Sequence, residues 1–497
     1  MQTPASPQNL AIGSVIIRSF ASKSLSLKLF GVPVLKRASI ASAVLIAASV
    51  SLISCGSYSN PSRTRQGSSH LKIRVFISNP LQPSAFGPTP VLNIVDASKD
   101  VLSAFTVSLA SSSPQPGLMA LSPNKNFTLI FSPTGNFITV VNNAQETAVT
   151  GSSGASSSIP LPDFTESMFV WIDNLTAYAA VPNAPVTGQP PTPGAVEVLN
   201  LSAGAISATL PVPGAHFVVQ SHNGNRILAF GDNSDVVTVI APSLIGTSED
   251  PRTFVCPDGT PESSITLCNP NPVNKVFDHP VWGIFSSDDT TAYILNCGPE
   301  CGGLAGTPAS ITVLDMNTNT SGTTPLPVHG ATIGLLSGTT LYVAGTPPPP
   351  APGANTCTGS TTAATSCGRL DVVDLTSMTV SGSAIITDGY HNRMEMGANG
   401  QLFIGAVRTC TNINIPASGS NPGEVRGCLS IFNTTNSNVV IPPDNGDVTG
   451  IQPITNRGVV YVCENGELRI YDTTTDKLQS KQIDIIGQAI DVKLVDF

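Results

Sequence analysis

The chain has 497 residues, a formal net charge of −9, 41% hydrophobic residues and only 11% charged residues. Soluble domains contain about 25% charged residues, so other polar groups must cover this surface. The 43 glycines and 42 prolines, combined with few charged helix formers, exclude long helices and coiled coils. High apolar content excludes an intrinsically disordered chain. The acidic balance excludes a nucleic-acid partner, because the excess of carboxylates would repel phosphates.

The first 54 residues have the composition of a secretory signal. They contain five basic side chains and no acidic one, and the apolar stretch 38–54 follows directly after Lys36 and Arg37. A basic region followed by an apolar one is typical of signal peptides, and a stretch of 17 residues is short for a spanning helix. It ends in Leu52-Ile53-Ser54-Cys55, which resembles the lipobox of bacterial lipoproteins.

That resemblance implies cleavage before Cys55 and attachment of lipid to its thiol and its new amino group. The expected parts are therefore a signal peptide (1–54), a lipidated cysteine with a flexible tether (55–70) and a main body (71–497). The 35 residues before Lys36 are more than such a leader needs. The alternative is an uncleaved signal anchor in which Cys55 happens to lie at the end. The lipoprotein interpretation predicts a location in the bacterial cell envelope, with the lipid anchored at the periplasmic face or in the outer membrane.

Nine cysteines remain once Cys55 is assigned to lipid, and eight of them form four pairs that are close in the sequence. Each pair lies in or beside a loop rich in Gly, Pro, Ser or Thr. The predicted disulfides are Cys256–Cys268, Cys297–Cys301, Cys357–Cys367 and Cys410–Cys428. Zinc is the alternative, but the sequence has no CxxC pairs and no histidine at ligand spacing. Cys463 lies in an apolar run, which favours a buried free thiol over a nucleophile.

Residues 71–497 repeat one unit of roughly 53 residues about eight times. Each unit opens with a short apolar strand and continues with a second strand that usually ends in Asp or Asn. A Thr/Ser/Asn-rich turn, a third polar strand and a fourth apolar strand complete the unit. The opening strands are expected at 73–78, 127–132, 176–181, 226–230, 292–297, 341–345, 402–407 and 459–463. Four strands at this spacing describe one blade of an all-β propeller.

The repeat resembles the YVTN-type, lactonase-like family of β-propeller repeat proteins. The matching stretches are Tyr293-Ile-Leu-Asn296, Leu341-Tyr-Val343, Val460-Tyr-Val462 and the strand and turn at 311–319. The resemblance implies a single propeller of four-stranded blades. That family usually has seven blades, whereas eight units are counted here. The resemblance also suggests lactone hydrolysis, but it matches no catalytic residues position by position.

The two ends of the repeat region complement each other. The stretch 488–497 has the pattern of a fourth strand, and the first unit lacks such a strand ahead of it. We therefore predict that the C-terminal strand completes the N-terminal blade and closes the ring, which removes exposed sheet edges.

Four of the six histidines recur at nearly one place in successive units, at the start of the fourth-type strand. They are His216, His279, His329 and His391. That strand is innermost in a propeller, so these imidazoles are expected near one mouth of the central channel. Three roles stay open for them: hydrogen-bonded structural groups, contacts to a small ligand, or ligands of a divalent metal.

The stretch 391–395 alternates, so His391, Arg393 and Glu395 are expected on one face of a strand. An arginine and a glutamate that face a channel can hold a polar ligand. The alternative is an ordinary ion pair. Together with the histidines, these residues are the candidate ligand contacts.

Two function classes remain. The first is a membrane-anchored extracytoplasmic propeller that binds a protein, a glycan or a small ligand through its disulfide-linked loops and channel mouth. The alternative is an enzyme, either a lactonase-like hydrolase or a metal-dependent enzyme, with its site at that mouth. We expect a monomer, with no cofactor unless the histidines hold a metal. Nucleophile-elbow, Walker, dinucleotide-binding, zinc-protease and EF-hand motifs are absent from the sequence.

Overall fold

Thirty-six β-strands and three short 3-10 turns form the described part of the chain, and it contains no α-helix. The computed structural model describes residues 68–496, except 85–86, 110–112, 151–157, 187–191, 323, 348–367, 409, 412, 416, 418–422, 444–445 and 480–481. The described residues belong to one compact unit, residues 62–497. The predicted signal peptide, Cys55 and most of the tether lie outside the described residues. Within the described ranges, no helix has the length and hydropathy needed to cross a bilayer.

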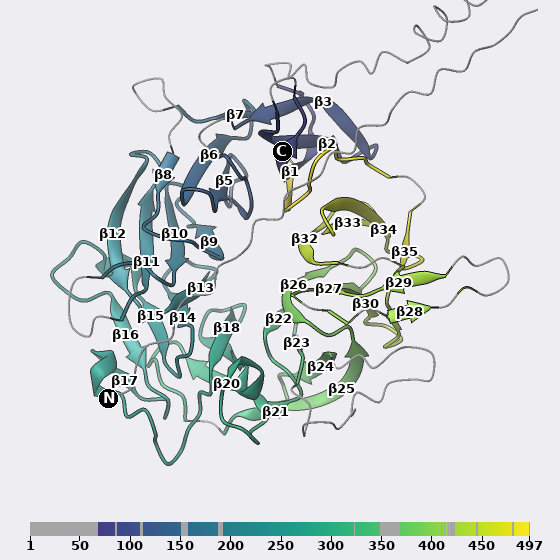
Figure 1. Cartoon of the computed structure of the whole chain (residues 1–497). Helices are drawn as coiled ribbons and strands as arrows, with labels where there is room; N and C mark the ends of the chain where they lie inside the picture. Colours follow the sequence, from purple (N-terminus) through teal and green to yellow (C-terminus); the bar gives the residue numbers. More distant parts are fainter. Residues whose placement is uncertain are drawn as a thin grey trace, which may run out of the picture. The chain divides into compact units, whose positions relative to one another are not determined.

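Eight of the antiparallel sheets stand around a central axis as the blades of a β-propeller (Figure 1). Every blade has four strands in its main path except the fourth, which gains a fifth, and a separate two-stranded sheet is inserted in the seventh. Eight blades confirm the number of repeats counted in the sequence. The number usual in the resembling family, seven, does not apply to this chain.

The first four blades contain the strands up to β17, together with β36 from the C-terminus. Blade 1 is β1 (Ile73–Gln82), β2 (Thr89–Asp96), β3 (Val101–Ser108) and β36 (Val492–Asp496). Blade 2 is β4 (Met119–Leu121), β5 (Phe127–Ser132), β6 (Phe137–Asn142) and β7 (Thr147–Ala148), with β8 (Ser158–Pro160) beside β6. Blade 3 is β9 (Ser167–Val170), β10 (Thr176–Val181), β11 (Ala195–Asn200) and β12 (Ala205–Pro211). Blade 4 is β13 (Ala215–Gln220), β14 (Ile227–Gly231), β15 (Val237–Ile240), β16 (Arg252–Val255) and β17 (Pro261–Glu262).

The other four blades follow in chain order. Blade 5 is β18 (Pro280–Phe285), β19 (Thr291–Asn296), β20 (Ala309–Asp315) and β21 (Leu326–Val328). Blade 6 is β22 (Ile333–Ser337), β23 (Thr340–Gly345), β24 (Gly368–Asp374) and β25 (Thr379–Ile386). Blade 7 is β26 (Tyr390–Met396), β27 (Gln401–Val407), β30 (Leu429–Asn433) and β31 (Val439–Val440), with the hairpin β28 (Ile413–Ile415) and β29 (Glu424–Arg426) inserted after β27. Blade 8 is β32 (Val448–Pro453), β33 (Val459–Glu464), β34 (Glu467–Asp472) and β35 (Lys477–Leu478). The 3-10 turns are η2 (Pro242–Leu244), η3 (Ile265–Leu267) and η4 (Gly298–Cys301).

Aspartates that end the second strand of a repeat unit, which is the third strand of its blade, have a structural role in the turns. Asp96, Asp374 and Asp472 each accept the backbone N–H of the residue two positions further on, at 2.8–3.0 Å. Such side-chain bonds mimic a backbone turn and start the hairpin to the outer strand. The recurring Asp or Asn of the repeat is therefore explained by turn geometry.

The hydrophobic core lies between neighbouring blades. One cluster joins blade 8 to blade 1 and includes Tyr461, Cys463, Val75 and Val492, all fully buried. Another joins blades 2 and 3. Each blade thus covers the apolar face of the next, and a lone blade would leave both of its faces in water.

The C-terminal strand closes the ring, as predicted. β36 pairs antiparallel with β1, from Ile73 opposite Asp496 to Ile77 opposite Val492. The carboxylate of Asp491, just before β36, accepts the backbone N–H of Met119 in blade 2 at 2.8 Å. The first and last blades are consequently side by side (Figure 1). The strand itself begins at Val492, four residues later than the expected start of the stretch.

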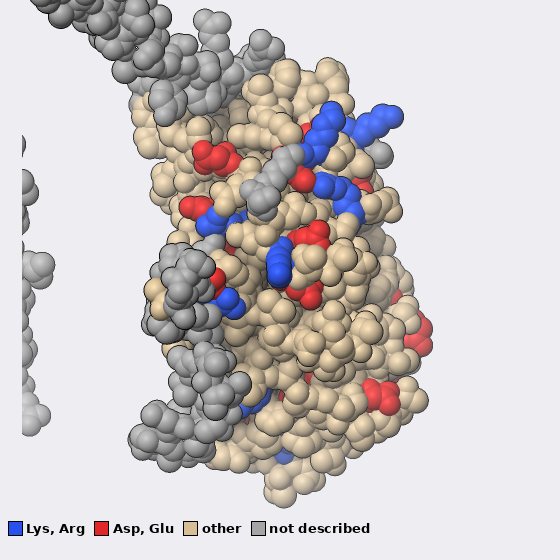
Figure 2. Space-filling model, turned by 90° about the vertical axis from the view of Figure 1, so that its right-hand side faces the viewer, with Lys and Arg blue, Asp and Glu red and all other residues tan. Residues whose placement is uncertain are grey.

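Three of the four predicted disulfides are formed: Cys256–Cys268, Cys297–Cys301 and Cys410–Cys428. Cys357 and Cys367 lie outside the described residues. Cys463 is a buried free thiol, and burial raises its pKa well above the ordinary value. The side of the molecule in Figure 2 is formed mainly by uncharged residues, in line with the low charged fraction of the sequence.

Candidate functional site

The innermost strands of the eight blades are β4, β9, β13, β18, β22, β26, β32 and β36. We call the face of the ring at which these strands begin the mouth face. Because neighbouring strands are antiparallel, each second strand ends at this face, as Tyr390 opposite Val407 illustrates. All three described disulfides lie in loops on the mouth face. They restrain long connections at the places where propellers usually carry function.

A cavity of about 510 Å³ lies in the channel behind the mouth face. Seven of the eight innermost strands contribute to its lining, β32 being the exception. Its volume falls within the range of roughly 300–1,000 Å³ that is typical of small-molecule sites. A smaller hollow of about 370 Å³ adjoins it and shares His216, Glu166, Tyr390 and Arg408.

β-bulges shape this cavity. The pairing register slips by one residue at the mouth end of β13, β18, β26 and β32. The extra residues are His216, Val281, Asn392 and Thr449. A bulge turns side chains away from strict alternation, and bulges are frequent beside functional sites. Three of these four residues, His216, Val281 and Asn392, line the cavity.

The bulge at Asn392 changes the expected arrangement of the stretch 391–395. Arg393 and Glu395 keep their alternation, but the extra residue interrupts it between His391 and Arg393. His391 is fully buried, whereas Arg393 is half-buried and Glu395 is exposed to the channel. The common face expected for all three residues is therefore wrong, because the sequence pattern assumed an unbroken ladder.

His391 is held as a neutral ring. Its Nε2 lies 2.9 Å from the carbonyl oxygen of Thr387, which can only accept, so Nε2 carries the proton. Burial lowers the pKa of His391 to about 4. The geometry favours a structural hydrogen bond for this residue.

The other three histidines pair with carboxylates at different depths. His216 Nδ1 lies 3.3 Å from Asp232, and burial lowers its pKa although Asp232 acts in the opposite direction. His279 Nδ1 lies 3.3 Å from Asp235, beside the smaller hollow. His329 Nδ1 lies 2.8 Å from Asp371, and its side chain is 55% exposed. Among the described residues that line the two cavities, His216, His279 and His391 are present and His329 is not.

The acidic cluster beside His279 already contains a cation. Three potential metal-ligand atoms, one from each of Asp235, Asp278 and His279, lie within 4.8 Å of one another, as a metal site would require. Lys275 Nζ, however, lies 2.9 Å from Asp235 and 3.0 Å from Asp278. The ammonium group offsets one of the two carboxylate charges. No group of three potential ligands among the described residues contains two of the four histidines.

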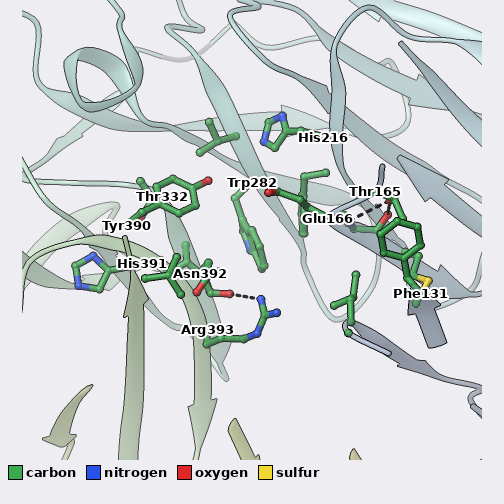
Figure 3. A pocket seen from close by; sticks show the side chains of 18 of the residues that line it. Phe131, Thr165, Glu166, His216, Trp282, Thr332, Tyr390, His391, Asn392 and Arg393 are labelled. Atoms are coloured by element: carbon green, nitrogen blue, oxygen red, sulfur yellow. Dashed lines mark hydrogen bonds between the residues drawn. The ribbon is translucent and has the colours of Figure 1, made fainter. Parts of the chain in front are cut away.

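Aromatic side chains that the sequence analysis missed form much of the cavity wall. The rings of Phe217 and Trp282 stack at a centroid distance of 3.9 Å and an interplanar angle of 18°. Figure 3 shows Trp282 in the middle of the cavity, with Tyr390 and Phe131 on opposite sides. Phe217 follows His216 by one residue and Trp282 follows His279 by three. The repeat alignment that singled out the histidines therefore contained this signal.

Charged groups ring the mouth of the channel. Glu166 before β9 and Arg408 after β27 form an ion pair at 3.0 Å. Burial, together with the negative charges of Glu166, Glu300 and Asp232, raises the pKa of Tyr390 to about 12. The phenol is therefore a neutral donor at physiological pH.

Glu300 is a second residue that the sequence analysis missed. It lies on η4, in the turn closed by the Cys297–Cys301 disulfide. Burial raises the pKa of its carboxyl to about 8, although the N–H of Thr346 donates to Oε2 at 2.8 Å and favours the charged form. A carboxyl that holds its proton near neutral pH can act as an acid or a base.

The fold and the cavity define an eight-bladed β-propeller with a ligand-sized site at one mouth of its channel. No family model matches the sequence, and no curated protein matches it either. Among solved structures, the chain is similar to dihydro-heme d1 dehydrogenase NirN, with a TM-score of 0.53 and 9% identity over 87% of this chain and 77% of that one. It is also similar to the periplasmic gluconolactonase PpgL of Pseudomonas aeruginosa, with a TM-score of 0.46 and 11% identity over 85% of this chain and 99% of that one. At 9% identity the likeness to NirN shows the fold alone, and the function has to be argued from the site.

Proposed function

We propose that this protein is a binding module whose small ligand occupies the cavity at the mouth of the central channel. The observation that carries the proposal is the lining: a stacked Trp282–Phe217 pair and charged side chains converge from seven strands on one space of about 510 Å³. Apolar and aromatic walls with a few fixed polar groups are typical of small-molecule sites. The rigid ring orders these groups before the ligand arrives, which lowers the entropic cost of binding.

The two tryptophans of the chain make a direct test of the proposal possible. Trp282 lines the cavity, whereas Trp171 donates to the carbonyl of Gly224 at 3.1 Å, at the far ends of the innermost strands. Trp171→Phe therefore leaves the cavity residue as the sole tryptophan. We expect a ligand from a metabolite library to change its emission, with no response in the matched Trp282→Phe variant. A library that never changes Trp282 emission would contradict the proposal.

We further propose that the protein is extracytoplasmic and is tethered to a membrane of the cell envelope through Cys55. The lipobox-like stretch 52–55 and the three disulfides support this location, because disulfides persist in oxidising compartments. Radioactive palmitate should label the wild-type chain and not the Cys55→Ala variant. Equal labelling of the two chains would contradict the anchor.

Hydrolysis is the second candidate function, and Glu300 is the observation in its favour. Its carboxyl lies on the mouth face and is protonated near neutral pH, as a general acid requires. The resemblance to lactonase-like propellers supplies the probe, δ-gluconolactone. If the protein is a hydrolase, it should open the lactone faster than buffer alone, and Glu300→Gln should abolish the excess. A rate equal to that of buffer would remove this candidate.

A further inference from the structure

Two β-bulges in neighbouring blades hold the guanidinium of Arg393 in the cavity. Its Nε donates to the carbonyl of Thr449 and its Nη1 to the carbonyl of Asn392, both at 2.9 Å. Thr449 and Asn392 are the extra residues of the bulges in β32 and β26. An extra residue leaves its backbone groups outside the regular ladder. The two bulges therefore fix this side chain, and the one at Asn392 also belongs to the cavity wall.

Among the described residues, the guanidinium of Arg393 forms no ion pair, although the charge of Glu395 acts on it through the cavity. The described residues place no carboxylate within ion-pair distance of its guanidinium, and its Nη2 makes no hydrogen bond to them. Lys493 of β36 adds a second cation to the lining, 3.6 Å from the buried Asp491. Glu395 also faces the channel, and the surrounding walls desolvate its carboxylate and raise its pKa, although Arg393 and Lys493 act in the opposite direction. Arg393 therefore presents a guanidinium to the cavity that is fixed in position and still has N–H groups to donate to an anion.

Aromatic and apolar groups surround this cation. Trp282 and Arg393 point into the same part of the cavity in Figure 3. Phe217 backs the indole ring, and Ile333 and Met394 extend the apolar wall. An aromatic body would bury its surface against these groups while an acidic group meets the guanidinium.

We propose that the cavity binds a small aromatic carboxylic acid, with its carboxylate on Arg393 and its ring against Trp282. This inference rests on the proposed binding function and names the ligand class. The carboxylate accepts from two of the three guanidinium N–H groups that make no hydrogen bond to the described residues. The cavity is large enough for a ring of one or two cycles with a short acidic side chain.

Isothermal titration of the full chain with three soluble probes separates the two parts of the proposal. Phenylacetate carries both the ring and the charge, phenylacetamide carries the ring alone, and acetate carries the charge alone. We expect phenylacetate to bind about tenfold more tightly than either of the others, because charge-assisted hydrogen bonds are the stronger ones. Equal affinity for phenylacetate and phenylacetamide, or no heat with phenylacetate, would overturn the inference.

Removing the charge of Arg393 and removing the charge of Glu395 should change phenylacetate binding in opposite directions, which assigns the affinity difference to Arg393. Arg393→Gln should weaken phenylacetate binding about tenfold and leave phenylacetamide unaffected, and Arg393→Lys should fall between wild type and Gln. Glu395→Gln removes the competing negative charge and should strengthen phenylacetate binding, which a merely structural change would not do. Arg226→Gln, on the far face of the ring, is the matched control and should change nothing. Unchanged binding in Arg393→Gln contradicts the inference.

The two proposals fail in different ways. If phenylacetamide binds as tightly as phenylacetate and both are lost in Trp282→Ala, the cavity is a binding site but the carboxylate assignment is wrong. If neither the three probes nor the metabolite library changes Trp282 emission, the binding function itself is wrong.

Discussion

The carboxylate of Glu166 and the guanidinium of Arg408 lie 3.0 Å apart, although 242 residues separate them in the sequence. They belong to blades 3 and 7, which face each other across a ring of eight. The same guanidinium lies 5.8 Å from the centre of the Tyr390 ring. The pair therefore crosses the mouth of the channel directly beside the cavity.

Replacing Glu166 by Gln should have little effect on stability. The two side chains are 48% and 67% exposed, and exposed ion pairs contribute about 0.2–1 kcal/mol. We expect the free energy of unfolding to fall by less than about 1 kcal/mol, and by less still at high salt. Urea denaturation at two salt concentrations measures this, with Arg408→Gln as the reciprocal variant. A loss that is large and insensitive to salt would contradict the assignment as a surface pair.

Deleting residues 488–497 should abolish cooperative unfolding. The deletion removes β36, exposes the edge of β1 and leaves the N–H of Met119 without the Asp491 carboxylate. Asp496→Asn is the matched control, because it removes the ion pair with Lys125 but keeps β36 in the chain. Calorimetry should show a sharp transition for the control and a broad one, or none, for the truncated chain. An unchanged transition in the truncated chain would refute closure by the C-terminal strand.

Glu300 should make the protein less stable as the pH rises. The ordinary pKa of its carboxyl is 4.5 and the folded value is about 8, so between these values the unfolded chain releases a proton that the folded chain retains. Stability attributable to this group is complete below pH 4.5 and is lost progressively up to about pH 8. Glu300→Gln should therefore raise the melting temperature by a few degrees at pH 8 and hardly at all at pH 5. An equal shift at both pH values would contradict a raised pKa.

Each disulfide should stabilise the fold by an amount that depends on the length of the loop that it closes. Cys410 and Cys428 are 18 residues apart, and Cys297 and Cys301 are 4 apart. Loop-closure entropy gives about 3 kcal/mol for the longer loop and about 2 kcal/mol for the shorter one. Urea unfolding of Cys410→Ser/Cys428→Ser and of Cys297→Ser/Cys301→Ser measures the two losses. A larger loss for the shorter loop would show that contacts of η4, and not chain entropy, decide its contribution.

Local features of the fold were predictable because neighbours in the sequence determine them. β5 and β10 occupy the expected ranges to the residue, since a short apolar run between two turn signals fixes a strand. The described disulfides join cysteines within one loop, so their pairing needed no knowledge of the fold. Ring closure followed from a surplus strand at one end and a missing strand at the other.

The cavity was only partly predictable. The repeat placed His216, His391, Arg393 and Glu395 on innermost strands, and all four line the cavity. The sequence did not predict how deeply each of these side chains is buried. A bulge depends on the hydrogen-bond ladder with the neighbouring strand, so the pattern 391–395 could not reveal that Asn392 is the extra residue.

By itself, the sequence determined the kind of strand, the turn chemistry, the number of blades and the way the ring closes, because each depends on short-range order repeated along the chain. The tertiary structure alone decided which side chains meet in the channel. Glu166 reaches Arg408, and Arg393 reaches the carbonyl of Thr449, because the ring brings distant blades to one axis and the bulges turn particular backbone groups inward. Those contacts depend on the curvature of the closed ring, which no single repeat contains.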